Sequence, residues 1–244
     1  MRPDAKKKIA TVTPKKGPNP VVIGAVVAAV LIVGVVVAIL VGASGKNNTS
    51  SAGSADPVGI VANDGGGILA NAATVKGNAP TVDLYEDFQC PTCGALEKAM
   101  GPTFSSLAKT GEIRLIVHTL SFLDDNLKND SSKRSANAVA CASDAGKFLE
   151  YHAAVFAAQP AQEGAGYTDA QLTAFATEVG ITGPALTTWQ KCTTSGQHDV
   201  YVADTQDAAS RAGVNQTPTV RLNGKDITMS TPEALVALVK AATK

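Results

Sequence analysis

Two of the four cysteines are separated by only two residues, in the segment Cys90-Pro-Thr-Cys93. Such a pair commonly contributes to a zinc site or alternates between a dithiol and a disulfide. A structural zinc site generally needs a second close pair of ligands. Here Cys141 and Cys192 are far apart in the sequence, and the three histidines are scattered. The spacing therefore favours a redox pair over zinc, and we expect neither a metal nor a cofactor.

The elements predicted on either side of this pair suit thiol chemistry. Residues 81–85 alternate as in a β-strand, and apolar residues recur at helical spacing from Pro91 to about Lys109. The first cysteine then lies at a helix N-terminus, where free backbone N–H groups and the helix dipole stabilise a thiolate. We predict that Cys90 is the exposed nucleophile and that Cys93, one turn further along, is the buried resolving thiol.

The remaining pattern completes an α/β order. A short strand is expected near Ile68, an apolar strand at residues 113–117, and a block of helices from about 131 to 212. Asn223-Gly224 predicts a hairpin between residues 219–222 and 227–229, followed by a helix from Pro232 to about Ala242. This order indicates an α/β fold with a helical insertion at about residues 130–212.

The N-terminal region reads as a membrane anchor. Residues 21–41 contain no charge, no polar side chain and no proline, which is enough to cross roughly 30 Å of hydrocarbon as a helix. We therefore predict a cytoplasmic basic tail at 1–20, a transmembrane anchor at 21–43, a flexible stalk at 44–78 and an extracytoplasmic domain at 79–244. A cleaved signal peptide is the alternative, although its apolar region would usually span only about 7–15 residues.

Charge and cysteine content limit the partners. The net charge is zero, but the first 43 residues contain six bases and one acid, so the rest of the chain is mildly acidic. An acidic exterior domain gives no reason to expect nucleic acid as a partner. An even number of cysteines outside the cytoplasm suggests two disulfides.

The other cysteines and the histidines have simpler interpretations. Cys141 and Cys192 fall in predicted helices of the insertion, so they fit a structural disulfide better than a catalytic one, with two free buried thiols as the alternative. We interpret His118 and His152 as packing or hydrogen-bonded residues, because no partner is placed for either to act on. Trp189 is expected in the core.

The segment Tyr-Glu-Asp-Phe-Gln-Cys-Pro-Thr-Cys-Gly at residues 85–94 resembles the active-site segment of the DsbA-like thioredoxin family, in its membrane-anchored extracytoplasmic branch. The likeness extends over about residues 66–243. It implies a thioredoxin-like core interrupted by a helical domain, which matches the order of elements above.

A second mark of that family is a Thr or Val followed by a cis-proline before a late strand, and Thr217-Pro218 resembles it. The resemblance implies that Pro218 faces the cysteine pair as part of the catalytic site. It also implies that Thr217 offers its backbone to an extended substrate, next to Pro91 and Thr92.

Two residues depart from the family pattern. Thioredoxins and many relatives have an acid six residues before the first cysteine, whereas this chain has Leu84. Glu86 and Asp87 are nearer to the motif and could substitute for that acid as a proton carrier for the buried thiol, but we interpret them as solvated or as capping the loop. Thr92 stands where strongly oxidising relatives have histidine, which predicts a Cys90 thiol that is less acidic than theirs.

The leading functional hypothesis is an enzyme that oxidises the thiols of exported proteins. The resemblance implies that a membrane quinone-linked partner reoxidises it. A reductase or isomerase of the same fold is one alternative, and Thr217 before the proline fits the isomerases. A non-catalytic binding module of this fold is the other, but it would have no need for an activated thiol.

Overall fold

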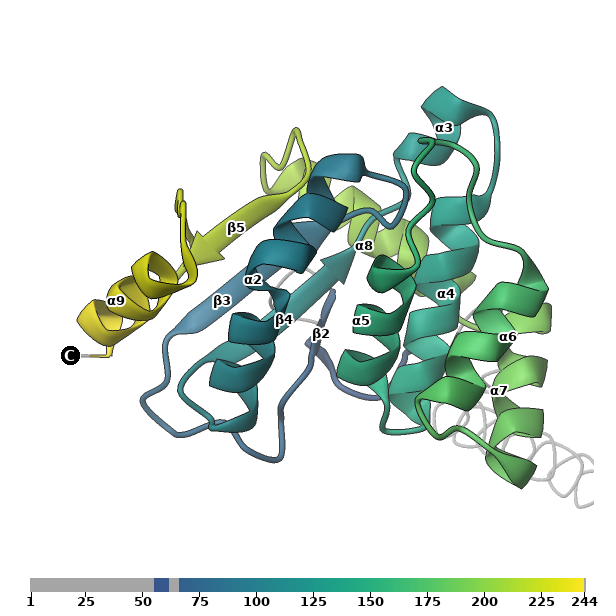
Figure 1. Cartoon of the computed structure of the whole chain (residues 1–244), viewed down its shortest axis with the longest axis horizontal. Helices are drawn as coiled ribbons and strands as arrows, with labels where there is room; N and C mark the ends of the chain where they lie inside the picture. Colours follow the sequence, from purple (N-terminus) through teal and green to yellow (C-terminus); the bar gives the residue numbers. More distant parts are fainter. Residues whose placement is uncertain (1–54, 62–65, 244) are drawn as a thin grey trace, which may run out of the picture. The chain divides into compact units, whose positions relative to one another are not determined.

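A mixed β-sheet of six strands organises the part of the chain that the computed structural model describes, residues 55–61 and 66–243 (Figure 1). The strand order is β1-β2-β4-β3-β5-β6. The strands are β1 (Ile60–Val61), β2 (Gly67–Leu69), β3 (Thr81–Glu86), β4 (Arg114–Thr119), β5 (Thr219–Leu222) and β6 (Lys225–Asp226).

Strand β3 lies in the middle of the sheet and leads directly to the cysteine pair. It runs parallel to β4, with Tyr85 opposite His118, and antiparallel to β5, with Leu84 opposite Val220. Five of its six residues are buried because both faces of the sheet are covered. The end of β3 is therefore fixed on both sides, and the loop that follows it starts from a rigid position.

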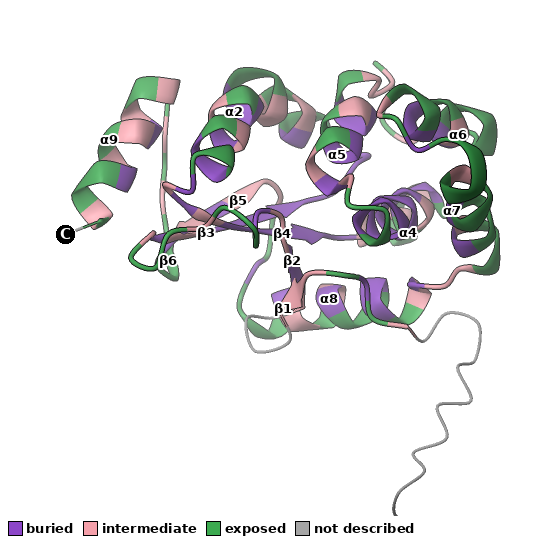
Figure 2. Cartoon of the chain, turned by 90° about the horizontal axis from the view of Figure 1, so that it is seen from below, coloured by how far each residue is buried: buried purple, intermediate pink, exposed green. Residues whose placement is uncertain are grey.

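Helices cover both faces of this sheet (Figure 2). Helices α2 (Pro91–Lys109), α5 (Phe148–Ala157) and α9 (Pro232–Ala242) lie over one face, and α8 (Asp199–Arg211) lies over the other. Between the layers, large apolar side chains are almost completely buried, among them Ile68, Phe88, Phe104, Leu115 and Leu235. This layered α/β arrangement agrees with the predicted fold.

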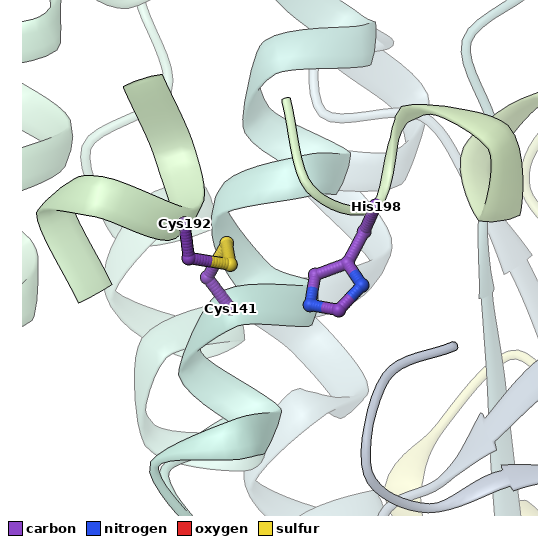
Figure 3. A group of neighbouring side chains, drawn as sticks. All are labelled: Cys141, Cys192 and His198. Atoms are coloured by element: carbon purple, nitrogen blue, oxygen red, sulfur yellow. A yellow bond between two sulfur atoms is a disulfide. The ribbon is translucent and has the colours of Figure 1, made fainter. Parts of the chain in front are cut away.

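The inserted block consists of α3 (Leu123–Leu127), α4 (Ser131–Asp144), α5, α6 (Asp169–Glu178), α7 (Gly183–Ser195) and α8. Helix α4 is rich in alanine and serine and is buried along most of its length, so neighbouring helices can approach it closely. A disulfide between Cys141 of α4 and Cys192 of α7 joins two of these helices, with Cα atoms 5.9 Å apart (Figure 3). Trp189 is buried, as the sequence predicts, and donates to the carbonyl of Ala138.

The hairpin near the C-terminus differs from the prediction. Asn223 and Gly224 both adopt positive φ angles, of 49° and 77°, and form the whole turn. Pairing therefore resumes at once, with Leu222 opposite Lys225 and Arg221 opposite Asp226. As a result the second strand is residues 225–226, and the predicted strand at 227–229 is wrong.

The predicted stalk at 44–78 also extends too far. Strand β2 pairs with β4 inside the sheet, and β1 pairs with β2. The buried Asn71 donates to the carbonyls of Ala108 and Ile113, at 2.9 Å each. The Gly- and Ala-rich composition suggested a flexible linker, but edge-strand pairing and one buried amide bind residues 66–78 to the domain.

The predicted tail and anchor, residues 1–20 and 21–43, lie outside the described residues. Within the described part of the chain, none of the helices combines the length and the apolar character that crossing a bilayer requires.

Candidate active site

Cys90 occupies the N-cap position of α2, directly after β3 and the short loop of residues 87–89. Its backbone is extended, with φ −76° and ψ 116°, and Pro91 takes the first helical position, where an N–H group is not needed. The carbonyl of Cys90 accepts hydrogen bonds from the N–H groups of Cys93 and Gly94, at 3.1 and 3.2 Å. The first cysteine therefore lies at the positive end of the helix dipole.

The exposure of Cys90 differs from the prediction of an exposed nucleophile. Its exposed fraction is 7%, whereas that of Cys93 is 0%. The Thr92 hydroxyl lies 3.0 Å from the Cys90 sulfur, and the Thr217 carbonyl oxygen lies 3.5 Å from it on the other side. Cys90 is therefore largely buried, although less completely than Cys93. The two thiols are not bonded to each other.

The surroundings push the acidities of the two thiols apart. Hydrogen bonds from Cys93 and Thr92 lower the pKa of Cys90 to about 5, although burial opposes this effect. Burial, the neighbouring Cys90 and the charge of Glu86 raise the pKa of Cys93 far above its usual value. Cys90 is therefore a thiolate at neutral pH and Cys93 a thiol.

Thr217 and Pro218, from the loop before β5, lie against the cysteine pair. The peptide bond between them is cis. The Thr217 carbonyl accepts a hydrogen bond from the Thr92 hydroxyl at 3.2 Å, so this loop is tied to the first turn of α2. Residues more than 120 positions apart in the sequence thus form one surface with Cys90, and Pro91 and Thr92 are exposed beside it.

The acids before the motif are buried, which corrects their interpretation as solvated residues. Asp87 is 0% exposed and accepts hydrogen bonds from the N–H groups of Gln89 (2.9 Å) and Leu123 (3.3 Å). Burial raises the pKa of Asp87 to about 7. Of the two roles predicted for Asp87, the loop cap is therefore the one that the structure supports, and the carboxyl that caps the loop is buried.

Glu86 is 1% exposed and contacts the insertion. Its Oε2 atom lies 3.0 Å from Nε2 of His152 in α5, so His152 is hydrogen-bonded as its interpretation required. The Nδ1 atom of His152 lies 3.9 Å from Glu97 of α2. Burial raises the pKa of Glu86 well above its usual value, burial lowers the pKa of His152, and burial raises the pKa of Glu97 to about 7.

Sequence reasoning missed several supports of the site. The side-chain amide of Gln159, just after α5, donates to the carbonyls of Phe88 and Cys90 at 2.9 Å each. The hydroxyl of Tyr167 donates to the carbonyl of Val155 at 3.0 Å. Both residues lie in an irregular segment that matches no motif, so no sequence signal could have assigned them to the active-site loop.

The second face of the sheet has its own buried pair. His118 of β4 lies 3.2 Å from Asp83 of β3 and stacks on the ring of Tyr85, with 4.1 Å between ring centroids. This agrees with the interpretation of His118 as a packing residue. Asp83 and His118 thus bond to each other rather than to the cysteine pair.

The comparisons with known proteins agree with this geometry. The thioredoxin family model matches residues 76–241. Reduced DsbG, a disulfide bond oxidoreductase from Mycobacterium tuberculosis, is 32% identical, with a TM-score of 0.59 over 69% of this chain and 85% of that one. Reduced DsbA from the same organism is also 32% identical, with a TM-score of 0.58 over 69% of this chain and 90% of that one. No curated protein matches the chain.

A more distant structure shares the fold over a larger part of the chain. MdbA, a thiol-disulfide oxidoreductase from Actinomyces oris, is 20% identical, with a TM-score of 0.65 over 80% of this chain and 94% of that one. The predicted family and enzyme class are confirmed by these matches. The chain belongs to the thioredoxin family, and within it to the thiol–disulfide oxidoreductases of the DsbA type.

Proposed function

We propose that this oxidoreductase forms disulfides in exported proteins, with Cys90 and Cys93 as its redox pair. The observation that carries the proposal is the position of Cys90 at the N-cap of α2, with the Thr92 hydroxyl 3.0 Å from its sulfur. Hydrogen bonds from Cys93 and Thr92 lower the pKa of Cys90 to about 5. A stabilised thiolate favours the reduced enzyme over its disulfide. The Cys90–Cys93 disulfide is then a strong acceptor of electrons from substrate thiols.

Catalysis begins with the disulfide form of the pair. A substrate thiolate attacks the sulfur of Cys90, a mixed disulfide forms, and Cys93 leaves as a thiolate. A second substrate thiolate then attacks the substrate sulfur that is bonded to Cys90. The substrate disulfide forms, Cys90 leaves as a thiolate, and two electrons have passed to the enzyme. Attack at Cys90 is favoured because Cys93 has no exposed surface.

The loop before β5 provides the opposing wall for the substrate. In this proposal, an extended substrate segment pairs with the backbone of Thr217, as extended peptides pair with free strand edges elsewhere. Pro218 holds the loop against Cys90, and Pro91 and Thr92 contact the substrate from the helix side. The 3.2 Å contact between the Thr92 hydroxyl and the Thr217 carbonyl supports this arrangement, because it joins both walls at the thiol.

The proposed location is outside the cytoplasm. The apolar run at 21–43, preceded by basic residues, would anchor the chain in the cell membrane with its catalytic domain on the exterior. The disulfide between Cys141 and Cys192 supports this location, because such bonds persist in oxidising compartments. A membrane quinone-linked protein would then reoxidise the reduced pair.

The two alternatives predict different behaviour. A reductase or isomerase needs a pair that stays reduced among its substrates, and Thr217 before Pro218 is the feature that fits this role. The low pKa of Cys90 argues against it, since it makes the disulfide easy to reduce. A non-catalytic binding module would show no turnover of any disulfide substrate.

A refolding assay tests the proposal. Purified oxidised enzyme is mixed with a reduced, unfolded protein that requires several disulfides, and substrate disulfides are counted by mass after thiol alkylation. The expected result is one substrate disulfide for each enzyme disulfide consumed, and none with Cys90→Ser. Efficient repair of a scrambled substrate without net oxidation would instead establish the isomerase alternative, and no exchange at all would establish the binding module.

A further inference from the structure

A groove of about 650 Å³ lies between α2 and α5, beside the cysteine pair. Its walls include Gly94, Glu97, Lys98, Phe156 and Gln159. The Glu97 side chain is 10% exposed, so it connects the groove with the buried region behind it. This connection matters because the groups behind Glu97 are titratable.

A chain of such groups leads from Glu97 to the end of β3. His152 has one ring nitrogen 3.9 Å from Glu97 and the other 3.0 Å from Glu86. Within the described part of the chain, the Oε1 atom of Glu86 is buried and has no hydrogen-bond partner. A buried carboxyl oxygen that stays unpaired is costly, so a purely structural acid would be poorly placed here.

Glu86, which has this unpaired carboxyl oxygen, lies near the thiol of Cys93. The backbone N–H of Asp87, which follows Glu86, donates a hydrogen bond to the sulfur of Cys93, and the charge of Glu86 raises the pKa of that thiol. The other acid of β3, Asp83, bonds to His118 instead. Cys93 is completely buried, so it cannot exchange its proton with water directly.

We infer that Glu86 exchanges a proton with the thiol of Cys93, and that His152 and Glu97 conduct this proton to and from the groove. The inference rests on the proposed function, because it concerns the steps in which Cys93 enters or leaves a disulfide. In the oxidising direction, Cys93 leaves as a thiolate and takes a proton from the Glu86 carboxyl.

The reverse step, resolution of a mixed disulfide by Cys93, balances in the same way. The Glu86 carboxylate takes the proton of the Cys93 thiol. The Cys93 sulfur then bonds to the Cys90 sulfur, the bond between Cys90 and the bound thiol compound breaks, and that compound leaves as a thiolate.

The charge of Cys90 determines when Glu86 holds or releases its proton. Two influences raise the pKa of Glu86: the larger is burial, and the second is the negative charge of Cys90. In the reduced enzyme Cys90 is charged and Glu86 keeps its proton. In a mixed disulfide Cys90 is neutral, so the second influence disappears and Glu86 releases its proton more readily. Burial keeps His152 neutral and able to accept this proton, and Glu97, with a pKa of about 7, exchanges it with water in the groove.

Other charged groups near this path are few within the described part of the chain. Cys90 faces Glu86 from the N-cap of α2, Cys93 and Glu97 face it from α2, and His152 faces it from α5. Asp87 adjoins Glu86 in the loop. Lys98 borders the groove, and Tyr167, whose pKa is raised by burial, lies beyond Asp87. Among these groups, only His152 is in contact with both Glu86 and Glu97.

The test separates the two thiol steps with glutathione disulfide as the probe. Reduced enzyme is mixed with an excess of the probe, quenched with acid at intervals and analysed by mass. The first step adds glutathione to Cys90, and the second, first-order step closes the Cys90–Cys93 disulfide. We expect Glu86→Gln to slow closure by about 10²-fold and to remove its pH dependence near neutrality. His152→Gln and Glu97→Gln should slow it less.

Glu150→Gln is the matched control, because it makes the same chemical change at an exposed residue of α5. The Glu150→Gln variant should close the Cys90–Cys93 disulfide at the rate of the wild type. Closure by Glu86→Gln and Glu97→Gln with the rate and pH profile of the wild type would overturn the inference. Absence of closure in the wild type itself would count against the proposed redox pair instead.

An infrared measurement keeps the test independent of rate. In a Cys93→Ser background, adding glutathione to Cys90 should weaken the absorption of buried protonated carboxyls. This loss should be missing in Glu86→Gln, in which Asp87 and Glu97, whose pKa values are about 7, still absorb. An absorption that does not change on the addition, or a loss of the same size in Glu86→Gln, contradicts the coupling between Cys90 and Glu86.

Discussion

The hydroxyl of Thr92 lies 3.0 Å from the sulfur of Cys90, close enough to donate a hydrogen bond to the thiolate. It also lies 3.2 Å from the carbonyl of Thr217, which gives its proton another acceptor when Cys90 is protonated or in a disulfide. The residue that replaces the histidine of strongly oxidising relatives is therefore placed to stabilise the thiolate without adding positive charge.

Thr92→Val removes this donor with little change in volume. We expect the pKa of Cys90 to rise above its value of about 5, because one of the hydrogen bonds that lower it is lost. The ultraviolet absorbance of the thiolate, followed against pH in the reduced protein, measures the change. Thr188→Val, at an exposed position in α7, is the control and should titrate as the wild type does. An unchanged titration in Thr92→Val would show that the hydroxyl does not stabilise the thiolate.

The pH dependence of stability follows from the same thiol. The pKa of Cys90 falls from 9.0 to about 5 on folding, so ionisation stabilises the reduced fold. This stabilisation is fully present at pH values above the pKa of Cys90 in the unfolded chain, and it is lost as the pH falls through about 5, the pKa in the folded protein. The free energy of urea unfolding of the reduced wild type, minus that of reduced Cys90→Ala, should therefore decrease between pH 9 and pH 5. A difference that is constant with pH contradicts the assignment, and the oxidised protein serves as the control.

The disulfide of the insertion should contribute stability rather than chemistry. Cys141 and Cys192 are 51 residues apart, and a crosslink of that length stabilises a fold by about 4 kcal/mol in the chain-entropy model. Replacing both by alanine should lower the free energy of unfolding by a few kcal/mol, measured with denaturant, and leave turnover per folded molecule unchanged. Loss of turnover in a variant that keeps its melting temperature would assign these cysteines to catalysis.

The order of the two thiols predicts which variant retains a substrate. Cys90 retains some exposed surface, whereas Cys93 has none, and the Cys90 thiol has the lower pKa. Cys90 should therefore alkylate faster than Cys93 in the reduced protein. Cys93→Ser should accumulate mixed disulfides with exported proteins, visible on non-reducing gels, because no thiol remains to resolve them. Cys90→Ser should accumulate none. Faster alkylation of Cys93, mapped by mass after brief labelling, would reverse the assigned roles.

The fold could be predicted largely from local patterns. The strand at 81–86, the helix that begins at Pro91 and the closing helix after Thr231 each have a short-range signature, and the structure places them as expected. A strand was expected near Ile68, but the start of the domain was placed too late, at residue 79. The pairing that binds β2 to the domain is with β4, almost 50 residues further along the chain, so no local pattern shows it.

The site was predictable only where a motif marks it. The cysteine pair and Thr217-Pro218 have recognisable spacing or neighbours, whereas Gln159 and His152 reach the site through the packing of α5 on α2. Glu86 was misjudged for the same reason. An acid at the end of a strand is usually solvated, and only the inserted helices, which no local pattern positions, bury this one.

The reduction potential of the Cys90–Cys93 pair distinguishes an enzyme that forms disulfides from one that reduces them. The purified protein is equilibrated in glutathione buffers of defined ratio, and the oxidised fraction is read by alkylation and mass. Because the Cys90 thiolate is stabilised, we expect a reduction potential close to that of strong oxidants, roughly −120 mV. A potential of about −270 mV, in the range of reducing thioredoxins, would contradict the account.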